Sequence, residues 1–168
     1  MDGSMLRDAF GHHVWATRRL LDVCAPLSEE HLASAAPGTY GSIIETLRHL
    51  VGADGWYLFV LTGGEAADTD VAAMGVADLR SVMEGHGEAW ERLLAGDLDP
   101  AETVVWRRED GFESHAPLGI RLAQAVHHGT DHRSQVCTTL TTLGIEPPAI
   151  DVWDFAEDGG RLKDVSPG

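Results

Sequence analysis

The sequence predicts an all-α protein, a four-helix bundle with a small β-hairpin excursion before the last helix. Apolar residues recur at helical spacing in four long segments, and most connections between these segments are short. The 168 residues suit a single domain, 1–168. Residues 1–4 are set aside from the fold as an expression remnant or a short native extension.

The first long helix is expected from about Met5 to Cys24. Its apolar positions Leu6, Phe10 and Leu21 lie near helical spacing, and Pro26 ends it. A short helical turn then restarts in the letters SEEHL, where Ser28 is suited to cap the first turn because its side chain can accept a backbone N–H.

The second and third long helices are expected over about 43–62 and 76–95. Ser42 and Glu45 form a capping-box pattern at the start of the second helix, and Gly63-Gly64 ends it. The third helix has the weakest pattern because two glycines interrupt it, and Gly96 is expected to cap its end.

The chain then changes to a hairpin before the fourth long helix. Asp110-Gly111 lies between two short extended runs, a sequence typical of a hairpin turn. Pro117 is expected in the first turn of the fourth helix, which ends at Leu143-Gly144. The tail beyond residue 150 is expected to be irregular, with Trp153 and Phe155 holding it against the body.

Composition and charge exclude several classes of function. The formal net charge of −15 disfavours nucleic acid and anionic membrane surfaces as partners, because both require clustered Lys and Arg. No apolar run approaches the ~20 residues needed to span a bilayer. Cys24 and Cys137 are the only cysteines, so no disulfide framework is indicated, and we expect a cytoplasmic protein.

A histidine pair on the fourth helix is the strongest chemical signal. His128 and His132 are four residues apart, so their side chains stack on one helical face, next to the apolar stripe. Neutral imidazoles at this spacing can converge on one metal ion. His127 is expected to point away. The apolar stripe consists of Leu122, Val126, Val136 and Leu140.

A third ligand is expected from another helix, and His49 is the best-placed candidate. It lies in the middle of the second long helix, where Gly52 and Ala53 leave space beside it for an ion and an exogenous ligand. Close helix packing is another reading of the same small residues. His12 and His13 are weaker alternatives, and the rest are expected in surface or loop positions: His31, His86 and His115.

Three imidazoles would leave a divalent ion with its full charge and open coordination positions, which is typical of a catalytic site. Such an ion lowers the pKa of bound water or stabilises a thiolate. Cys137 is expected to act as a small buried apolar residue and not as a nucleophile.

These motifs resemble the DinB/YfiT-like metalloenzyme family, which includes the N-terminal domain of mycothiol-dependent maleylpyruvate isomerase. The resemblance spans nearly the whole chain, through HHVWATRRLL, GTYGSIIETLRHLVGADGWYL and HHGTDHRSQVCTTLTTLGIEPPAID. The last segment is similar to the closing H-x-x-x-H-R-G-Q pattern of the family. By position, the metal ligands of the family match His49, His128 and His132.

Two positions depart from the family pattern. Ser134 stands where glycine is usual, and Asp131 stands where histidine is frequent, but neither change removes a ligand. Asp131 is expected on the solvated face of the helix, and the alternative is a carboxylate–imidazole contact that tunes the site. Arg121 is a candidate to hold a substrate carboxylate, on position alone.

The resemblance implies an up-down-down-up bundle, often dimeric, that binds zinc, nickel or iron. It also implies transfer of a low-molecular-weight thiol such as mycothiol or bacillithiol to an electrophilic substrate, by a thiol S-transferase or a thiol-dependent isomerase. Two alternatives are a metal-dependent hydrolase and a stress-related bundle that binds a metal or ligand without turnover.

Overall fold

The computed structural model describes residues 3–66, 68–163 and 165. Of the N-terminal segment that was set aside, residues 1 and 2 lie outside the described residues, whereas residues 3 and 4 belong to the first helix. The described elements follow in this order: α1 (Gly3–Cys24), α2 (Glu29–Leu32), α3 (Ile43–Leu61), α4 (Val76–Leu94), β1 (Thr103–Arg107), β2 (Glu113–Pro117), α5 (Leu118–Thr142) and α6 (Val152–Asp158).

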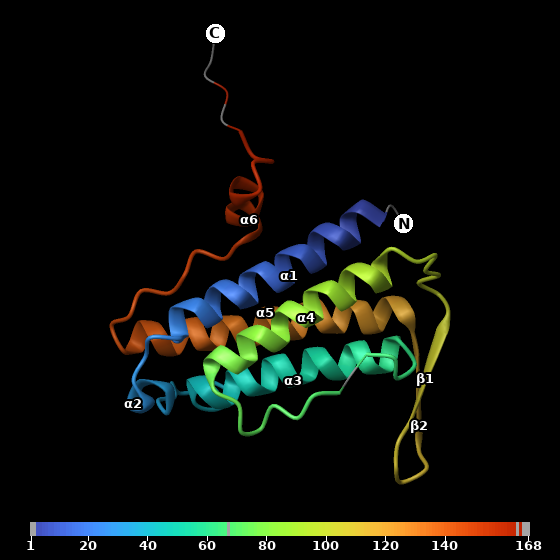
Figure 1. Ribbon diagram of the computed structural model, residues 1–168, viewed down its shortest axis with the longest axis horizontal. Helices are drawn as coiled ribbons and strands as arrows, with labels where there is room; N and C mark the ends of the chain where they lie inside the picture. Colours follow the sequence, from blue (N-terminus) through green and yellow to red (C-terminus); the bar gives the residue numbers. More distant parts are fainter. Residues whose placement is uncertain (1–2, 67, 164, 166–168) are drawn as a thin grey trace.

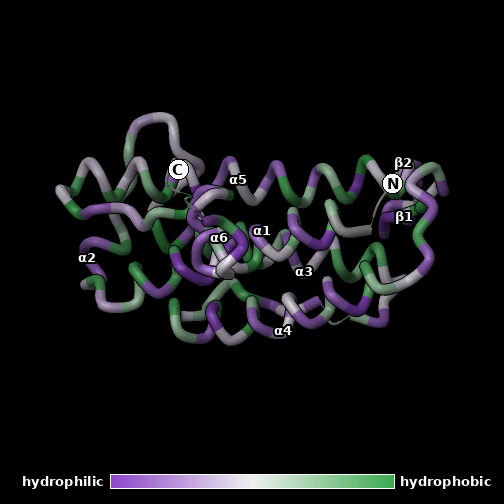
Figure 2. The backbone as a smooth tube through the Cα atoms, turned by 90° about the horizontal axis from the view of Figure 1, so that it is seen from above, coloured by the Kyte–Doolittle hydropathy of each residue, from purple (hydrophilic) through white to green (hydrophobic). Residues whose placement is uncertain are grey.

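The long helices α1, α3, α4 and α5 lie side by side and form the body of the molecule (Figure 1). Helices α1 and α3 each pack against both α4 and α5. Hydrophobic and hydrophilic segments alternate along each helix (Figure 2), as expected where one face is buried. Within the described residues, none of the helices is long and apolar enough to cross a membrane.

The helix boundaries follow local capping chemistry that the sequence predicted. The hydroxyl of Ser42 accepts from the backbone N–H of Glu45, and the Glu45 carboxylate accepts from the backbone N–H of Ser42. The side chain of Ser28 likewise caps α2. Helix α5 ends just before Gly144, whose φ of 72° is a conformation that glycine adopts without a steric penalty.

Two helix ends differ from the predicted ones. Helix α4 ends at Leu94, and Ala95 takes the capping position in a right-handed helical conformation, so Gly96 is not a left-handed cap. Pro117 is the last residue of β2 and precedes α5 instead of lying in its first turn. At this junction the lack of a backbone N–H in Pro117 removes no hydrogen bond from the helix.

The prediction of an irregular tail is wrong, because residues 152–158 form α6. The side chain of Asp151 accepts from two backbone N–H groups in the first turn, and Asp154 completes the capping box. Phe155 packs against Trp15 of α1 with ring centroids 5.5 Å apart, as expected. Trp153 does not hold the tail in place, since it is 69% exposed.

The hairpin projects from the end of the body at which α5 begins (Figure 1). Its antiparallel strands pair from Thr103 with Pro117 to Arg107 with Glu113. Gly111 has a φ of 84°, which explains the Asp-Gly sequence in the turn. The predicted hairpin is therefore confirmed.

Candidate metal centre

Three histidines from two helices meet at the surface between α3 and α5. The capping box at Ser42 fixes the start of α3 and therefore the face on which His49 lies. His128 and His132 come from adjacent turns of α5. One ring nitrogen from each histidine lies within 4.8 Å of the others, so the structure brings together the predicted trio.

The rings of His49, His128 and His132 form a compact cluster. The Nε2 atoms of His49 and His128 are 3.0 Å apart. The ring centroids are 4.9 Å apart for His49 and His128, 4.6 Å for His49 and His132, and 4.4 Å for His128 and His132. Two ligands of a tetrahedral zinc ion at ordinary Zn–N distances would be about 3.4 Å apart, so the spacing suits a shared ion.

Gln135 orients His132. The backbone N–H of Tyr40 donates to Oε1 of Gln135 at 2.8 Å, which identifies that atom as the amide oxygen. The same oxygen is 3.3 Å from Nδ1 of His132, so Nδ1 is the nitrogen that carries the proton. Nε2 of His132 therefore keeps its lone pair available for a metal ion.

Tyr40 and Tyr57 border the cluster. The ring of Tyr40 stacks on His49 with centroids 4.1 Å apart and meets His132 edge to face. Tyr57 contacts His128 in the same edge-to-face manner. These aromatic contacts restrict the orientation of the imidazoles, which a binding site with fixed geometry requires.

The electrostatic setting favours the neutral form of His49 and His128. Burial, followed by repulsion from His132 and His49, lowers the pKa of His128 to about 4. Burial and repulsion from His132 also lower the pKa of His49. A metal ion binds the neutral ring, so both shifts keep the ligands in the binding form at neutral pH. The donor set therefore fits a divalent transition-metal ion.

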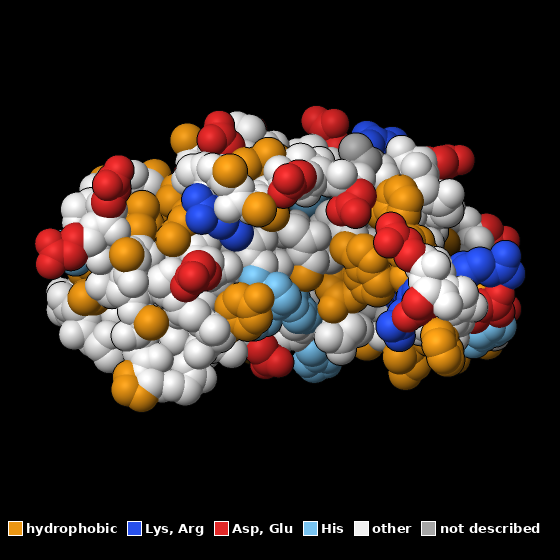
Figure 3. All heavy atoms as spheres, turned by 90° about the horizontal axis from the view of Figure 1, so that it is seen from below, with side chains coloured by type: hydrophobic (Ala, Val, Ile, Leu, Met, Phe, Trp, Pro, Cys, Tyr) orange, Lys and Arg blue, Asp and Glu red, His pale blue; other side chains and the backbone are white. Residues whose placement is uncertain are grey.

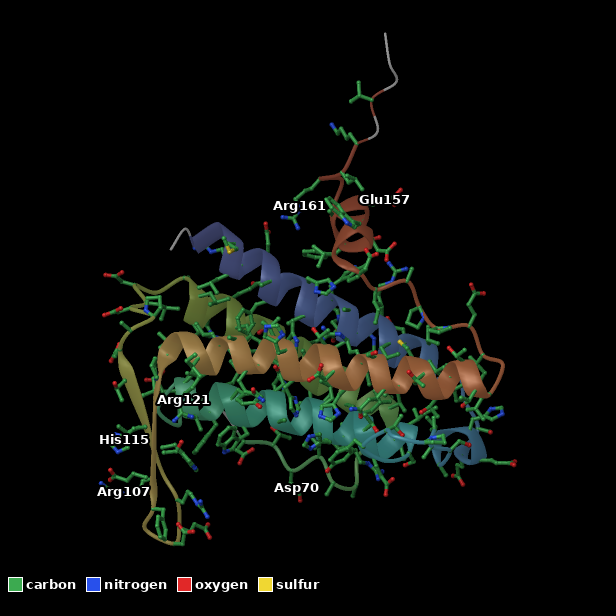
Figure 4. All side chains as sticks on the ribbon, turned by 180° about the vertical axis from the view of Figure 1, so that it is seen from behind. Asp70, Arg107, His115, Arg121, Glu157 and Arg161 are labelled. Carbon is green, nitrogen blue, oxygen red and sulfur yellow. The ribbon has the colours of Figure 1, made fainter. Side chains whose placement is uncertain are left out.

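An open cleft of about 1070 Å³ borders His49. Gly52 and Ala53 line it from α3, and residues 68–72 form the opposite wall. The Cβ that an alanine would add at Gly52 would lie 2.9 Å from Val71, so Gly52 also allows this wall to approach the helix. Gly52 therefore lies beside the open cleft, but its close contact is with a loop, whereas the packing alternative expected a neighbouring helix. Figure 3 shows histidine side chains gathered near the middle of one face, and Figure 4 shows Asp70 in the segment that follows α3.

The remaining residues that the sequence singled out on α5 are either exposed to solvent or in contact with the hairpin. His127 and Asp131 are exposed, as predicted. Arg121 is buried at the junction of α5 and the hairpin (Figure 4), where its NH2 donates to the carbonyl oxygens of Val104 and Ser114 at 3.2 and 2.8 Å. Arg121 therefore anchors the hairpin, and a substrate carboxylate would have to compete with these two carbonyl groups.

The prediction that His86 lies on the surface is wrong. His86 is buried, and its Nδ1 lies 3.0 Å from Oδ2 of Asp54. His13 is also buried, and its Nε2 lies 2.8 Å from Oδ1 of the same carboxylate. Sequence reasoning missed Asp54, although a carboxylate in the apolar interior of α3, three residues after Val51, was a signal of a buried polar contact.

The thiols of the chain are poor nucleophiles. Burial, with a contribution from Cys137, raises the pKa of Cys24 to about 12. Burial also raises the pKa of Cys137. Both cysteines therefore stay protonated at neutral pH, in agreement with the apolar role predicted for Cys137.

A second cavity lies away from this cluster, between α1 and α4. It has a volume of about 730 Å³, with Phe10 and Trp90 in its lining and Phe155 of α6 at its edge. None of the described residues that line it is a histidine or a cysteine, so it offers no nitrogen or sulfur ligands of the kind that the cluster provides.

Comparison with known proteins identifies the family of the chain. The chain has no match among curated proteins. The DinB family profile matches residues 1–161, which include all three histidines of the cluster. The chain therefore belongs to the DinB family.

Proposed function

We propose that His49, His128 and His132 hold a divalent zinc, nickel or iron ion in a metal-dependent enzyme. The convergence of three imidazoles on one point carries this proposal. A divalent ion held by neutral ligands keeps its full charge and lowers the pKa of a thiol or a water that binds it. The DinB family match and the open cleft beside His49 add support.

The reaction that we propose is transfer or isomerisation dependent on a low-molecular-weight thiol similar to mycothiol or bacillithiol. The raised pKa of Cys24 and Cys137 supports an external thiol, because neither side chain can supply a thiolate. The cleft of about 1070 Å³ is large enough for a thiol and an electrophilic substrate. This proposal includes a cytoplasmic location, an up-down-down-up bundle and a homodimer.

Metal content tests the first part of the proposal. Protein purified without an affinity tag is expected to contain a transition metal, and adding Zn²⁺ or Ni²⁺ to the metal-free protein is expected to raise its melting temperature. The proposal is wrong if elemental analysis finds no metal and neither ion changes the melting temperature.

Turnover tests the second part. Metal-loaded protein is incubated with mycothiol or bacillithiol and monochlorobimane, and the thioether product is measured against a metal-free control. Cleavage of esters or amides without added thiol would favour the hydrolase instead. Tight metal retention without either activity would favour a binding protein.

A further inference from the structure

A chain of hydrogen bonds crosses the interior between the two helices that carry the histidine cluster. It starts at Asp54 on α3, continues through His13 on α1 and ends at Arg133 on α5. The Oδ1 atom of Asp54 is 2.8 Å from Nε2 of His13, and Nδ1 of His13 is 3.1 Å from NH1 of Arg133. All three side chains are at least 98% buried. We call this set the His13 strut.

The proton positions in the strut follow from its chemistry. A guanidinium can only donate, so Nδ1 of His13 accepts from Arg133 and carries no proton. Nε2 of His13 then carries the ring proton and donates to the Asp54 carboxylate. The strut therefore joins a buried anion to a buried cation through one neutral imidazole in a single tautomer.

The strut meets α5 next to His128 and His132. Arg133 directly follows His132, and Gly129 directly follows His128. An added Cβ at Gly129 would lie 2.4 Å from Cε1 of His13 and 2.9 Å from NH1 of Arg133. The His13 ring thus rests against the α5 backbone at Gly129, within one turn of both histidines.

The strut also meets α3 close to its histidine. Asp54 is five residues, about one and a half turns, after His49. Trp90 of α4 donates its indole N–H to both oxygens of Asp54, at 3.2 and 3.1 Å, and so holds the carboxylate in place. Each end of the strut is therefore fixed next to a segment that carries a histidine of the cluster.

We propose that His13, Asp54 and Arg133 are positioning residues that set the separation of α3 and α5 at the metal centre. The inference rests on the proposed metal function. Buried ions contribute little net stability, because desolvation offsets their attraction. The contribution of the strut is fixed geometry. The cluster needs ligand nitrogens from both helices at the same distance from the ion, and the strut holds the two helices at a set separation.

Two variants cut the strut at different points, and a third is the matched control. His13→Leu removes the central link, and Arg133→Met removes only the end at α5. Thr17→Val removes a buried hydroxyl that accepts from NH1 of Arg133 at 3.1 Å but leaves the link between α3 and α5 intact. Circular dichroism and a cooperative melt identify which variants fold.

Zn²⁺ affinity by chelator competition and the visible absorption of the Co²⁺ form are then measured on every folded variant. His13→Leu and Arg133→Met are expected to weaken Zn²⁺ binding by about 10- to 100-fold and to change the Co²⁺ spectrum, because the ligands stay but their spacing changes. Thr17→Val is expected to match the wild type in both measurements.

Three results would overturn the inference. The strut does not position the ligands if either cut variant folds and keeps wild-type affinity and spectrum. An equal loss of Zn²⁺ affinity in Thr17→Val would show that removing any buried polar group weakens binding, whether or not the group belongs to the strut. Wild-type protein that binds neither ion would refute the proposed function itself, a result distinct from the first two. If His13→Leu fails to fold, Arg133→Met decides.

Discussion

The histidines of α5 show how position on a helix decides the role of a residue. His127 is exposed, whereas the next residue, His128, has its Nε2 atom 3.0 Å from Nε2 of His49. His132 lies one turn further on and donates through Nδ1 to Gln135. The sequence predicted this division because a rotation of about 100° per residue separates neighbouring side chains.

Alanine substitutions test the division. His128→Ala and His132→Ala are each expected to abolish Zn²⁺ binding, because two remaining imidazoles are a weak ligand set. His127→Ala is expected to bind Zn²⁺ as the wild type does. Isothermal titration calorimetry of the three variants measures this, and an equal loss in all three would contradict the assignment.

The ionisation of a single residue, Asp54, predicts how the stability of the fold depends on pH. Burial alone would raise its pKa, but the contacts of the carboxylate with His13 and His86 outweigh burial and hold the pKa well below its usual range. Arg133 adds a nearby positive charge. Because the pKa is lower in the folded protein, ionised Asp54 stabilises the fold above about pH 4, and this stability is lost as the pH falls below that value.

Asp54→Asn is therefore expected to cost about 3 kcal/mol or more at pH 7, because it leaves the buried Arg133 without its counter-charge. The difference from the wild type should shrink between pH 4 and pH 2. Urea unfolding at several pH values measures both. A difference that stays constant over that range would show that Asp54 is not ionised in the folded protein.

At the scale of elements, two glycines in long helices have opposite surroundings. Gly129 of α5 faces the His13 ring, whereas an added Cβ at Gly85 of α4 would meet no atom within 4 Å. Alanine favours a helix over glycine by about 1 kcal/mol when nothing else changes. The same substitution should therefore act in opposite directions at the two positions.

Gly85→Ala is expected to stabilise the protein by up to about 1 kcal/mol. Gly129→Ala is expected to destabilise it by about 1–3 kcal/mol, because the methyl group would displace His13 and Arg133. Thermal and urea unfolding of both variants measure the two signs. Stabilisation by Gly129→Ala would contradict the close approach of His13 to α5.

Local signals explain which elements the sequence predicts and which it hides. The capping box at Ser42 and the Asp-Gly turn identify α3 and the hairpin without any tertiary information. Helix α6 was missed because seven residues are too few for a periodic pattern, although Asp151 was a usable cap. His86 was misplaced because the glycines on either side of it suggested a surface turn, while its spacing from Met83 and Trp90 matched the buried face of α4.

At the scale of the whole molecule, contacts between helices are the part that periodicity cannot provide. The small residues beside His49 and the family resemblance selected that residue. Periodicity placed His128 and His132 on one helical face. It does not give the rotation of one helix against another. The stacking of Tyr40 on His49 and the link from Asp54 to His13 therefore come only from the three-dimensional structure.

The tail gives a prediction at this scale. Helix α6 packs on α1, where Trp15 donates its indole N–H to Asp158 at 2.9 Å, whereas the histidine cluster lies on α3 and α5. A truncated variant that ends at Ile150 is expected to have a lower melting temperature than the full chain. Its tryptophan emission should shift to the red, because Trp15 loses its contacts with α6 and becomes more exposed to water. Zn²⁺ affinity should stay unchanged, and a weakened affinity would show that α6 supports the metal centre.

The wall of the cleft opposite His49 has an evolutionary consequence. The segment 68–72 contributes to this wall but supplies none of the three ligands. It rests on α3 through Val71 at Gly52, and Arg48 donates to the nearby carbonyl of Met74 at 2.9 Å. Insertions and substitutions in this segment would therefore reshape the cleft in a descendant while leaving the three histidines in place.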